Sequence, residues 1–239
     1  MPEYLNVVLL SLFAGAAMPA GALLARLDLL HPAFLTRQAR QFIVAFGGGA
    51  LISAVALVLV PEGAKKLSVL PAVLCFACGG IVFYFLDSAL SKLKSSAGQL
   101  AAMLSDFIPE AIALGAAFAV GESTGLILAL LMVLQNLPEG FNAYEELVDS
   151  ANLSGNKVLG AFFCLAIVGP LCALTGYFLL ADAHEFVAGI MLFAGAGILY
   201  LVFQDVAPES KAVNGGIPAL GAVAGFLLGL VGNMVLAPT

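Results

Sequence analysis

The sequence predicts an all-α polytopic membrane protein, with eight transmembrane helices in one domain that covers residues 1–239. The chain is 62% hydrophobic and only 10% charged, whereas about a quarter of the residues of soluble domains are charged. Its apolar residues gather in stretches of about 20, the length that crosses a bilayer as a helix. Short separators that carry Pro, Gly and Lys divide these stretches. So many long apolar stretches cannot form one soluble core.

Eight such stretches follow one another, and each predicts a helix. We expect helices at 4–26, 40–60, 68–91, 99–121, 123–145, 157–180, 185–206 and 216–237. No basic segment precedes the first stretch, so we expect a retained helix rather than a cleaved signal.

The basic residues predict the orientation, because Lys and Arg favour cytoplasmic loops. Seven of the nine Lys and Arg residues flank odd-numbered loops, and only Lys65 and Lys66 lie in an even-numbered one. Odd loops are therefore expected in the cytoplasm and both termini outside it. The compact chain favours a bacterial inner (cell) membrane, with the lipid bilayer as its surroundings.

Several function classes lack their motifs. The chain has no GxxxxGK[ST] run for ATP, no Ser/His or HExxH arrangement for an enzyme, and no basic patch for nucleic acid. The pair Cys75 and Cys78 lies in an apolar stretch, where cysteines are usually packing residues. We therefore expect a protein that is not an enzyme and has no prosthetic group.

Polar residues recur inside the fourth and fifth predicted helices. Residues 105–110 read Ser-Asp-Phe-Ile-Pro-Glu and residues 134–139 read Leu-Gln-Asn-Leu-Pro-Glu. Asp106 and Glu110 are four residues apart, as are Gln135 and Glu139, so each pair shares one helix face. Acids inside a membrane segment are costly and usually functional. Each proline also removes one helical hydrogen bond and frees a carbonyl oxygen.

These residues predict one cavity that is lined by oxygen ligands. Neither helix carries Lys or Arg, so its carboxylates need a metal ion or protons for neutralisation. An interhelical hydrogen-bonded cluster that only fixes packing is the alternative, above all for the two amides. The candidate ligands are Asp106, Glu110, Gln135, Asn136 and Glu139.

The sequence also contains a weak internal repeat. Residues 46–62 align with residues 193–209 at a constant offset of 147, and the two intramembrane Pro-Glu pairs repeat at an offset of 29. Both offsets relate helices of opposite direction. This predicts an inverted repeat of helices 1–3 and 6–8 around helices 4–5, with the substrate site near the midplane.

With these motifs the chain resembles the ZIP (Zrt/Irt-like) family of divalent metal transporters, as a divergent bacterial-type member. The resemblance rests on Asp106-Phe107-Ile108-Pro109-Glu110, on Gln135-Asn136-Leu137-Pro138-Glu139-Gly140, and on the Pro-Glu pairs that end helices two and seven. It implies eight transmembrane helices and a metal site at mid-membrane. It also implies transport of a divalent cation toward the cytoplasm.

This chain departs from the family pattern at several positions. Asp106 stands where the family usually has His, Phe107 where it has Asn, and Val58 where it often has His. The sixth helix has no acid that could serve a second metal. We therefore expect one metal position with oxygen ligands, which keeps Zn²⁺, Fe²⁺, Mn²⁺ and Cd²⁺ open as substrates and favours the harder ions.

The expected function is a secondary transporter for a divalent metal ion. A non-transporting metal sensor or scaffold, to which Phe107 points, and a proton-coupled carrier of another small solute remain alternatives. Small residues in several helices would permit a homodimer. Asp87, Asp205, Glu145, Glu146 and His184 are expected to be solvated, with a role in metal entry or exit as the alternative.

Overall fold

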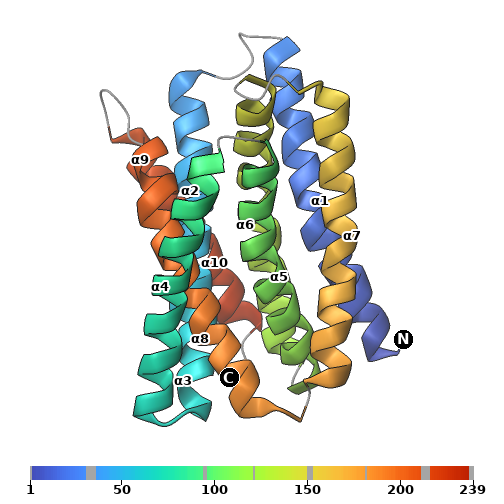
Figure 1. Ribbon diagram of the computed structural model, residues 1–239, viewed down its shortest axis with the longest axis vertical. Coiled ribbons are helices and arrows are strands. Elements are labelled where there is room, and N and C mark those ends of the chain that lie inside the picture. Colours follow the sequence, from blue (N-terminus) through green and yellow to red (C-terminus); the bar gives the residue numbers. More distant parts are fainter. Residues whose placement is uncertain are drawn as a thin grey trace.

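The computed structural model describes residues 2–30, 36–93, 96–120, 122–149, 153–180, 182–210 and 216–236 (Figure 1). These residues contain no β-strand. The helices are α1 (Glu3–Leu30), α2 (Arg37–Ala54), η1 (Val55–Leu59), α3 (Val60–Lys66), α4 (Val69–Leu93), α5 (Ser96–Val120), α6 (Glu122–Asp149), α7 (Gly155–Leu179), α8 (His184–Leu201), η2 (Val202–Val206), α9 (Ala207–Glu209) and α10 (Ile217–Leu236). A few helical residues, Asp106 among them, have side chains outside the described set.

Each of the eight predicted stretches corresponds to a helical rod in the structure. The second rod joins α2, η1 and α3, and the seventh joins α8, η2 and α9. Seven of the rods are long and apolar enough to cross a membrane, as judged on the described residues. These seven do not include α5, so a membrane crossing by α5 stays a prediction. The fold is that of an all-helical, multi-pass membrane protein.

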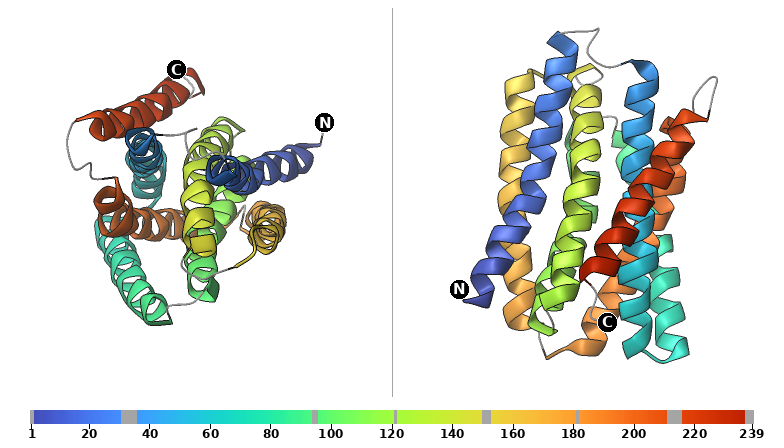
Figure 2. Two further views of the ribbon diagram at one scale, coloured as in Figure 1. Left: turned by 90° about the horizontal axis from the view of Figure 1, so that it is seen from above. Right: turned by 180° about the vertical axis from the view of Figure 1, so that it is seen from behind.

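The helices pack in two groups, which Figure 2 shows on either side of the view from above. α1 packs against α6 and α7, and α5 packs against α6 and α7. On the other side α2 packs against α10, and α8 packs against α3 and α4. Contacts of α2 with α6 and of α5 with α8 join the two groups. We call the first set the site group and the second the outer group.

This division differs from the one that the repeat suggests. A split into helices 1–3 and 6–8 would place α1 with α2 and α4, whereas α1 packs on α6 and α7. Glycines explain the α1–α6 contact, because Gly21 lies against the backbone of Leu137 and Gly140 against the backbone of Met18. Side chains there would push the helix axes apart. The inverted repeat itself stays a prediction.

Two π-helical turns interrupt the second and seventh rods. In η1 the N–H of Val60 donates to the carbonyl of Val55, and in η2 the N–H of Ala207 donates to that of Val202. A proline, Pro61 or Pro208, follows each turn by two residues. The two turns are separated by 147 residues, which is the offset of the predicted repeat. α3 and α9 lie at opposite ends of the bundle (Figure 1), so the rods are antiparallel.

Candidate cation site

The centre of the site is a buried hydrogen bond between α5 and α6. Nε2 of Gln135 donates to Oε2 of Glu110 at 2.5 Å. The exposed fractions are 5% for Glu110 and 3% for Gln135, so water screens this contact little. The structure thus brings together two of the predicted site residues, which are 25 positions apart in the sequence.

Glu139 lies beside this pair, one turn after Gln135 on α6. Residues four apart on a helix share a face, so Glu139 lies on the same side of α6 as the Gln135 amide that contacts Glu110. Within the described part of the chain, neither carboxylate forms a salt bridge with Lys or Arg. Two neighbouring carboxylates in an apolar surrounding need a proton or a cation, since uncompensated buried charge costs several kcal/mol.

Gln135 also carries a buried oxygen that lacks a partner. Oε1 of Gln135 has no hydrogen-bond partner among the described residues and is shielded from solvent. An unsatisfied buried acceptor costs about 1–3 kcal/mol. An oxygen of this kind beside two carboxylates is a chemically suitable ligand for a cation.

Asn136 turns away from Glu110 and toward α1. Its Nδ2 donates to the carbonyl oxygen of Ala14 at 2.9 Å, and the residue is 1% exposed. A step of 100° along α6 separates Asn136 from Gln135, so the two amides face different neighbours. The structure therefore shows Asn136 as a link between α6 and α1, and its role as a metal ligand stays a prediction.

The side chain of Asp106 lies outside the described residues, so its place in the site stays a prediction. Its neighbour Phe107 is buried in the core, with 2% exposed. The tip of the Phe107 ring fills a notch between α1 and α7, where side chains at Gly15 and Gly169 would meet it at 3.2 and 2.8 Å. An apolar ring thus fills the space between α5, α1 and α7.

Pro138 lies at the boundary between the two helix groups. α5 and α6 both continue as helices through Pro109 and Pro138, so neither helix is broken. A side chain at Gly47 of α2 would approach Cγ of Pro138 to 2.7 Å. The polar segment of α6 therefore meets α5, α1 and α2 through consecutive faces of a single turn.

The sequence did not predict two contacts among the more peripheral polar residues. The hydroxyl of Tyr200 donates to Oδ2 of Asp87 at 3.0 Å, and Arg40 pairs with Glu145 at 3.1 Å. Glu145 and Glu146 lie on α6, which continues to Asp149, four residues past the predicted end of this helix. The charge of Arg40, four residues into α2, was the available signal for the ion pair. His184 is exposed at the first turn of α8.

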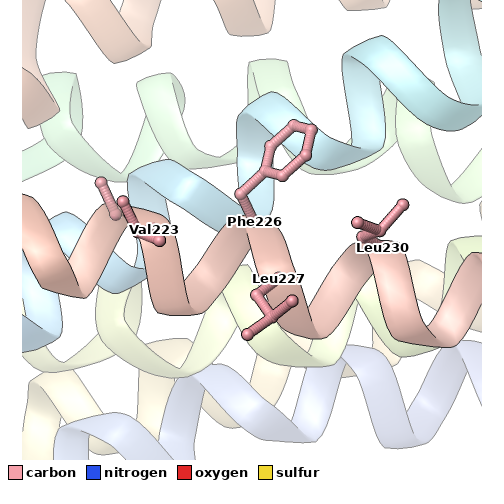
Figure 3. A pocket seen from close by; sticks show the side chains of 5 residues that line it. Val223, Phe226, Leu227 and Leu230 are labelled. Atoms are coloured by element: carbon pink, nitrogen blue, oxygen red, sulfur yellow. The ribbon is translucent and has the colours of Figure 1, made fainter.

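Two cavities lie away from these residues. A shallow apolar groove runs along α10 and is lined by Val223, Phe226, Leu227 and Leu230 (Figure 3), together with Ala222. Apolar surfaces of this kind suit lipid chains. The second cavity, of about 330 Å³, lies between α2, η2, α9 and α10. Neither contains a predicted site residue.

Among the described residues, no group of three or more His, Cys, Asp and Glu side chains is placed to hold a metal ion. Comparison with known families found no family model that matches the chain, and comparison with curated proteins found no match. The interpretation of the site therefore rests on its own chemistry.

Proposed function

We propose that this protein is a secondary transporter that carries a divalent metal cation across the membrane toward the cytoplasm. The observation that carries the proposal is the buried Glu110–Gln135 contact beside Glu139, in which Oε1 of Gln135 has no hydrogen-bond partner among the side chains and backbone that the structure describes. The resemblance to the ZIP family in the two Pro-Glu segments supports the same function.

A cation is the simplest complement to these groups. Two carboxylates and an amide oxygen supply three acceptor groups, while the Gln135 amide nitrogen donates to Glu110. A bound divalent ion would neutralise the two carboxylates and would also be coordinated by the amide oxygen of Gln135. Protons alone would neutralise the carboxylates, but they would leave the amide oxygen no better satisfied unless a protonated acid turned toward it.

The ligand types favour harder ions. Glu110, Gln135 and Glu139 offer oxygen only, and oxygen ligands suit Mn²⁺, Mg²⁺ and Ca²⁺, whereas imidazole and thiolate favour Zn²⁺ and Cd²⁺. The described cysteines lie on α4 and α7, outside this cluster. We therefore infer that this site favours Mn²⁺ or Fe²⁺ over Zn²⁺ more than a site that contains histidine does.

The packing suggests how access to the site alternates. The site lies in one helix group, and its boundary with the other group runs past Pro138 and Gly47. We infer that the site group moves against the outer group, so that the cation faces each side of the membrane in turn. These two groups differ from the two predicted repeats, helices 1–3 and helices 6–8.

Uptake of a panel of divalent metals into proteoliposomes tests the proposal. The variant Glu110→Gln/Glu139→Gln keeps the size of both side chains and removes their charge, so we expect saturable uptake to be lost. Glu185→Gln, at an exposed position on α8, is the matched control and should retain uptake.

The alternatives predict different results in the same experiment. A metal sensor or scaffold would bind metal, as measured by calorimetry, without flux in the folded wild-type protein. A carrier of another solute would show no metal-dependent flux and no metal binding that Glu110→Gln/Glu139→Gln removes. Either result would overturn the transporter proposal.

A further inference from the structure

The rods that contain η1 and η2 make reciprocal contacts. A side chain added at Gly48 of α2 would meet Val206 of η2, and one added at Gly195 of α8 would meet Leu59 of η1. Gly195 follows Gly48 by 147 residues, and Val206 follows Leu59 by the same number. Each rod therefore presents a glycine to the π-helical turn of the other.

The π-helical turns are also weak points in hydrogen bonding. Val60 donates to Val55, so it does not make the α-helical bond to Ala56. Pro61 has no N–H and can replace neither the α-helical nor the π-helical bond at that position. Ala207 and Pro208 repeat this arrangement in η2. Helices bend most readily at such places, where a π-helical turn meets a proline.

The two reciprocal contacts are unequal in this structure. A Cβ at Gly48 would lie 2.9 Å from Cγ1 of Val206, which is too close without a shift. A Cβ at Gly195 would lie 3.5–3.7 Å from Val55, Leu59 and Val60, at ordinary van der Waals distance. The cavity of about 330 Å³ borders the tighter contact, with Gly48 and Val206 in one wall and Pro218 and Ala219 of α10 in another. η2 therefore has space beside it.

We propose that η1 and η2 are a matched pair of hinges, and that the tight glycine contact passes from one to the other when the protein changes conformation. In the present conformation η2 is held tightly on Gly48 and η1 loosely on Gly195. In the second conformation η1 closes on Gly195 and η2 moves off Gly48. The proposed transport function supplies the purpose of this exchange. The exchange itself is a change of conformation, which can be measured without transport.

Alanine at the two glycines should therefore have opposite effects. Gly48→Ala requires the Val206 side chain of η2 to shift away from α2, toward the cavity beside it, so we expect this variant to favour the second conformation. Gly195→Ala fits the present conformation and opposes the second.

Spin labels report the two ends of the bundle separately. In a background without the native cysteines, spin labels would be attached to cysteines introduced in pairs. Double electron–electron resonance would then measure the distance between labels at positions 209 and 157, at the end that holds α9. It would also measure the distance between labels at positions 66 and 175, at the end that holds α3. For Gly48→Ala we expect a second distance population at both ends. For Gly195→Ala we expect the wild-type population, or a narrower one. Equal effects of the two variants, or no effect of Gly48→Ala, would overturn the proposal.

Pro208→Ala is a second variant that needs no new space. It restores an N–H, so η2 can form regular α-helical bonds and lose its hinge. We expect a narrower Glu209–Lys157 distance distribution than in the wild type, and an unchanged width would contradict the proposal. Because neither measurement requires metal or flux, their outcome is independent of the transport experiment.

Discussion

At the scale of single residues, Gln135 decides the chemistry of the site. Its amide donates one hydrogen to Glu110, and its oxygen has no hydrogen-bond partner within the described part of the chain. Replacement by His would supply an imidazole nitrogen at a buried position beside the carboxylates. The type of the ligand at this position should therefore control which metals compete.

We predict that Gln135→His shifts the competition order of uptake toward Zn²⁺ and Cd²⁺, since imidazole favours these ions more than an amide oxygen does. Competition of unlabelled metals against Mn²⁺ uptake measures the shift. Gln204→His, at an exposed position of η2, is the matched control. An unchanged order in Gln135→His would show that the Gln135 side chain is not a ligand.

Asn136 gives a second prediction, because its amide links α6 to Ala14 of α1. Asn136→Ala should lower stability by about 1 kcal/mol, the scale of an interhelical hydrogen bond in membranes. It should leave the metal concentration for half-maximal uptake near the wild-type value. Thermal unfolding in detergent and uptake measure the two effects. A large loss of metal affinity without loss of stability would instead make Asn136 a ligand.

The residue pattern predicted that Glu110 and Gln135 line one cavity, and it left Asn136 open between a metal ligand and an interhelical hydrogen bond. Intramembrane acids and amides must find partners, and the two Pro-Glu segments offered few others. Asn136 is adjacent to Gln135, and the direction of its side chain depends on how α6 is rotated against α1. That rotation is set by packing around Gly21 and Gly140, which the sequence shows only as small residues.

At the scale of helices, the close crossing of α1 and α6 positions the site. Gly140 lies against the backbone of Met18, just past Glu139. Gly140→Val should destabilise the protein by about 1–3 kcal/mol, as overpacking does, because a backbone cannot rotate away as a side chain can. Gly160→Val on α7 is the control, since nothing lies within 4 Å of a Cβ there. Thermal unfolding followed by size-exclusion chromatography should show a lower stability for Gly140→Val than for Gly160→Val. Equal losses of stability in the two variants would contradict the assigned contact.

Hydropathy predicted that the helices exist, but it placed some of their ends too early. Pro61 was taken as the end of the second helix, whereas the rod continues through α3 to Lys66. A proline is tolerated near the start of a helical segment, where its missing N–H matters less. The π-helical turn before it was not predictable, because a change of hydrogen-bond register leaves no mark in hydropathy.

At the scale of the whole molecule, the repeat and the packing carry different information. A repeat indicates which helices resemble each other. The two helix groups depend instead on which helix faces carry glycines that allow close packing against a neighbouring helix. For this reason the eight helices were predictable, and the division into a site group and an outer group was not. The division has a direct consequence for motion, because a link between the groups should act differently from a link within one.

Two polar contacts at one end of the bundle allow this comparison. Arg40 of α2 pairs with Glu145 of α6, so that contact crosses between the groups. Nη1 of Arg26 on α1 donates to Asn156 on α7 at 2.8 Å, so that contact lies inside the site group. In a background without the native cysteines, Arg40→Cys/Glu145→Cys and Arg26→Cys/Asn156→Cys can each be joined by a reducible bis-methanethiosulfonate reagent.

We predict that joining residues 40 and 145 stops metal uptake, because the site group can no longer move against the outer group. Reduction of the link should restore uptake to the level before crosslinking. Joining residues 26 and 156 should leave uptake unchanged, since both residues move together. If both links stopped uptake, motion within the site group would also be needed. If neither did, the cation would cross without relative movement of the two groups.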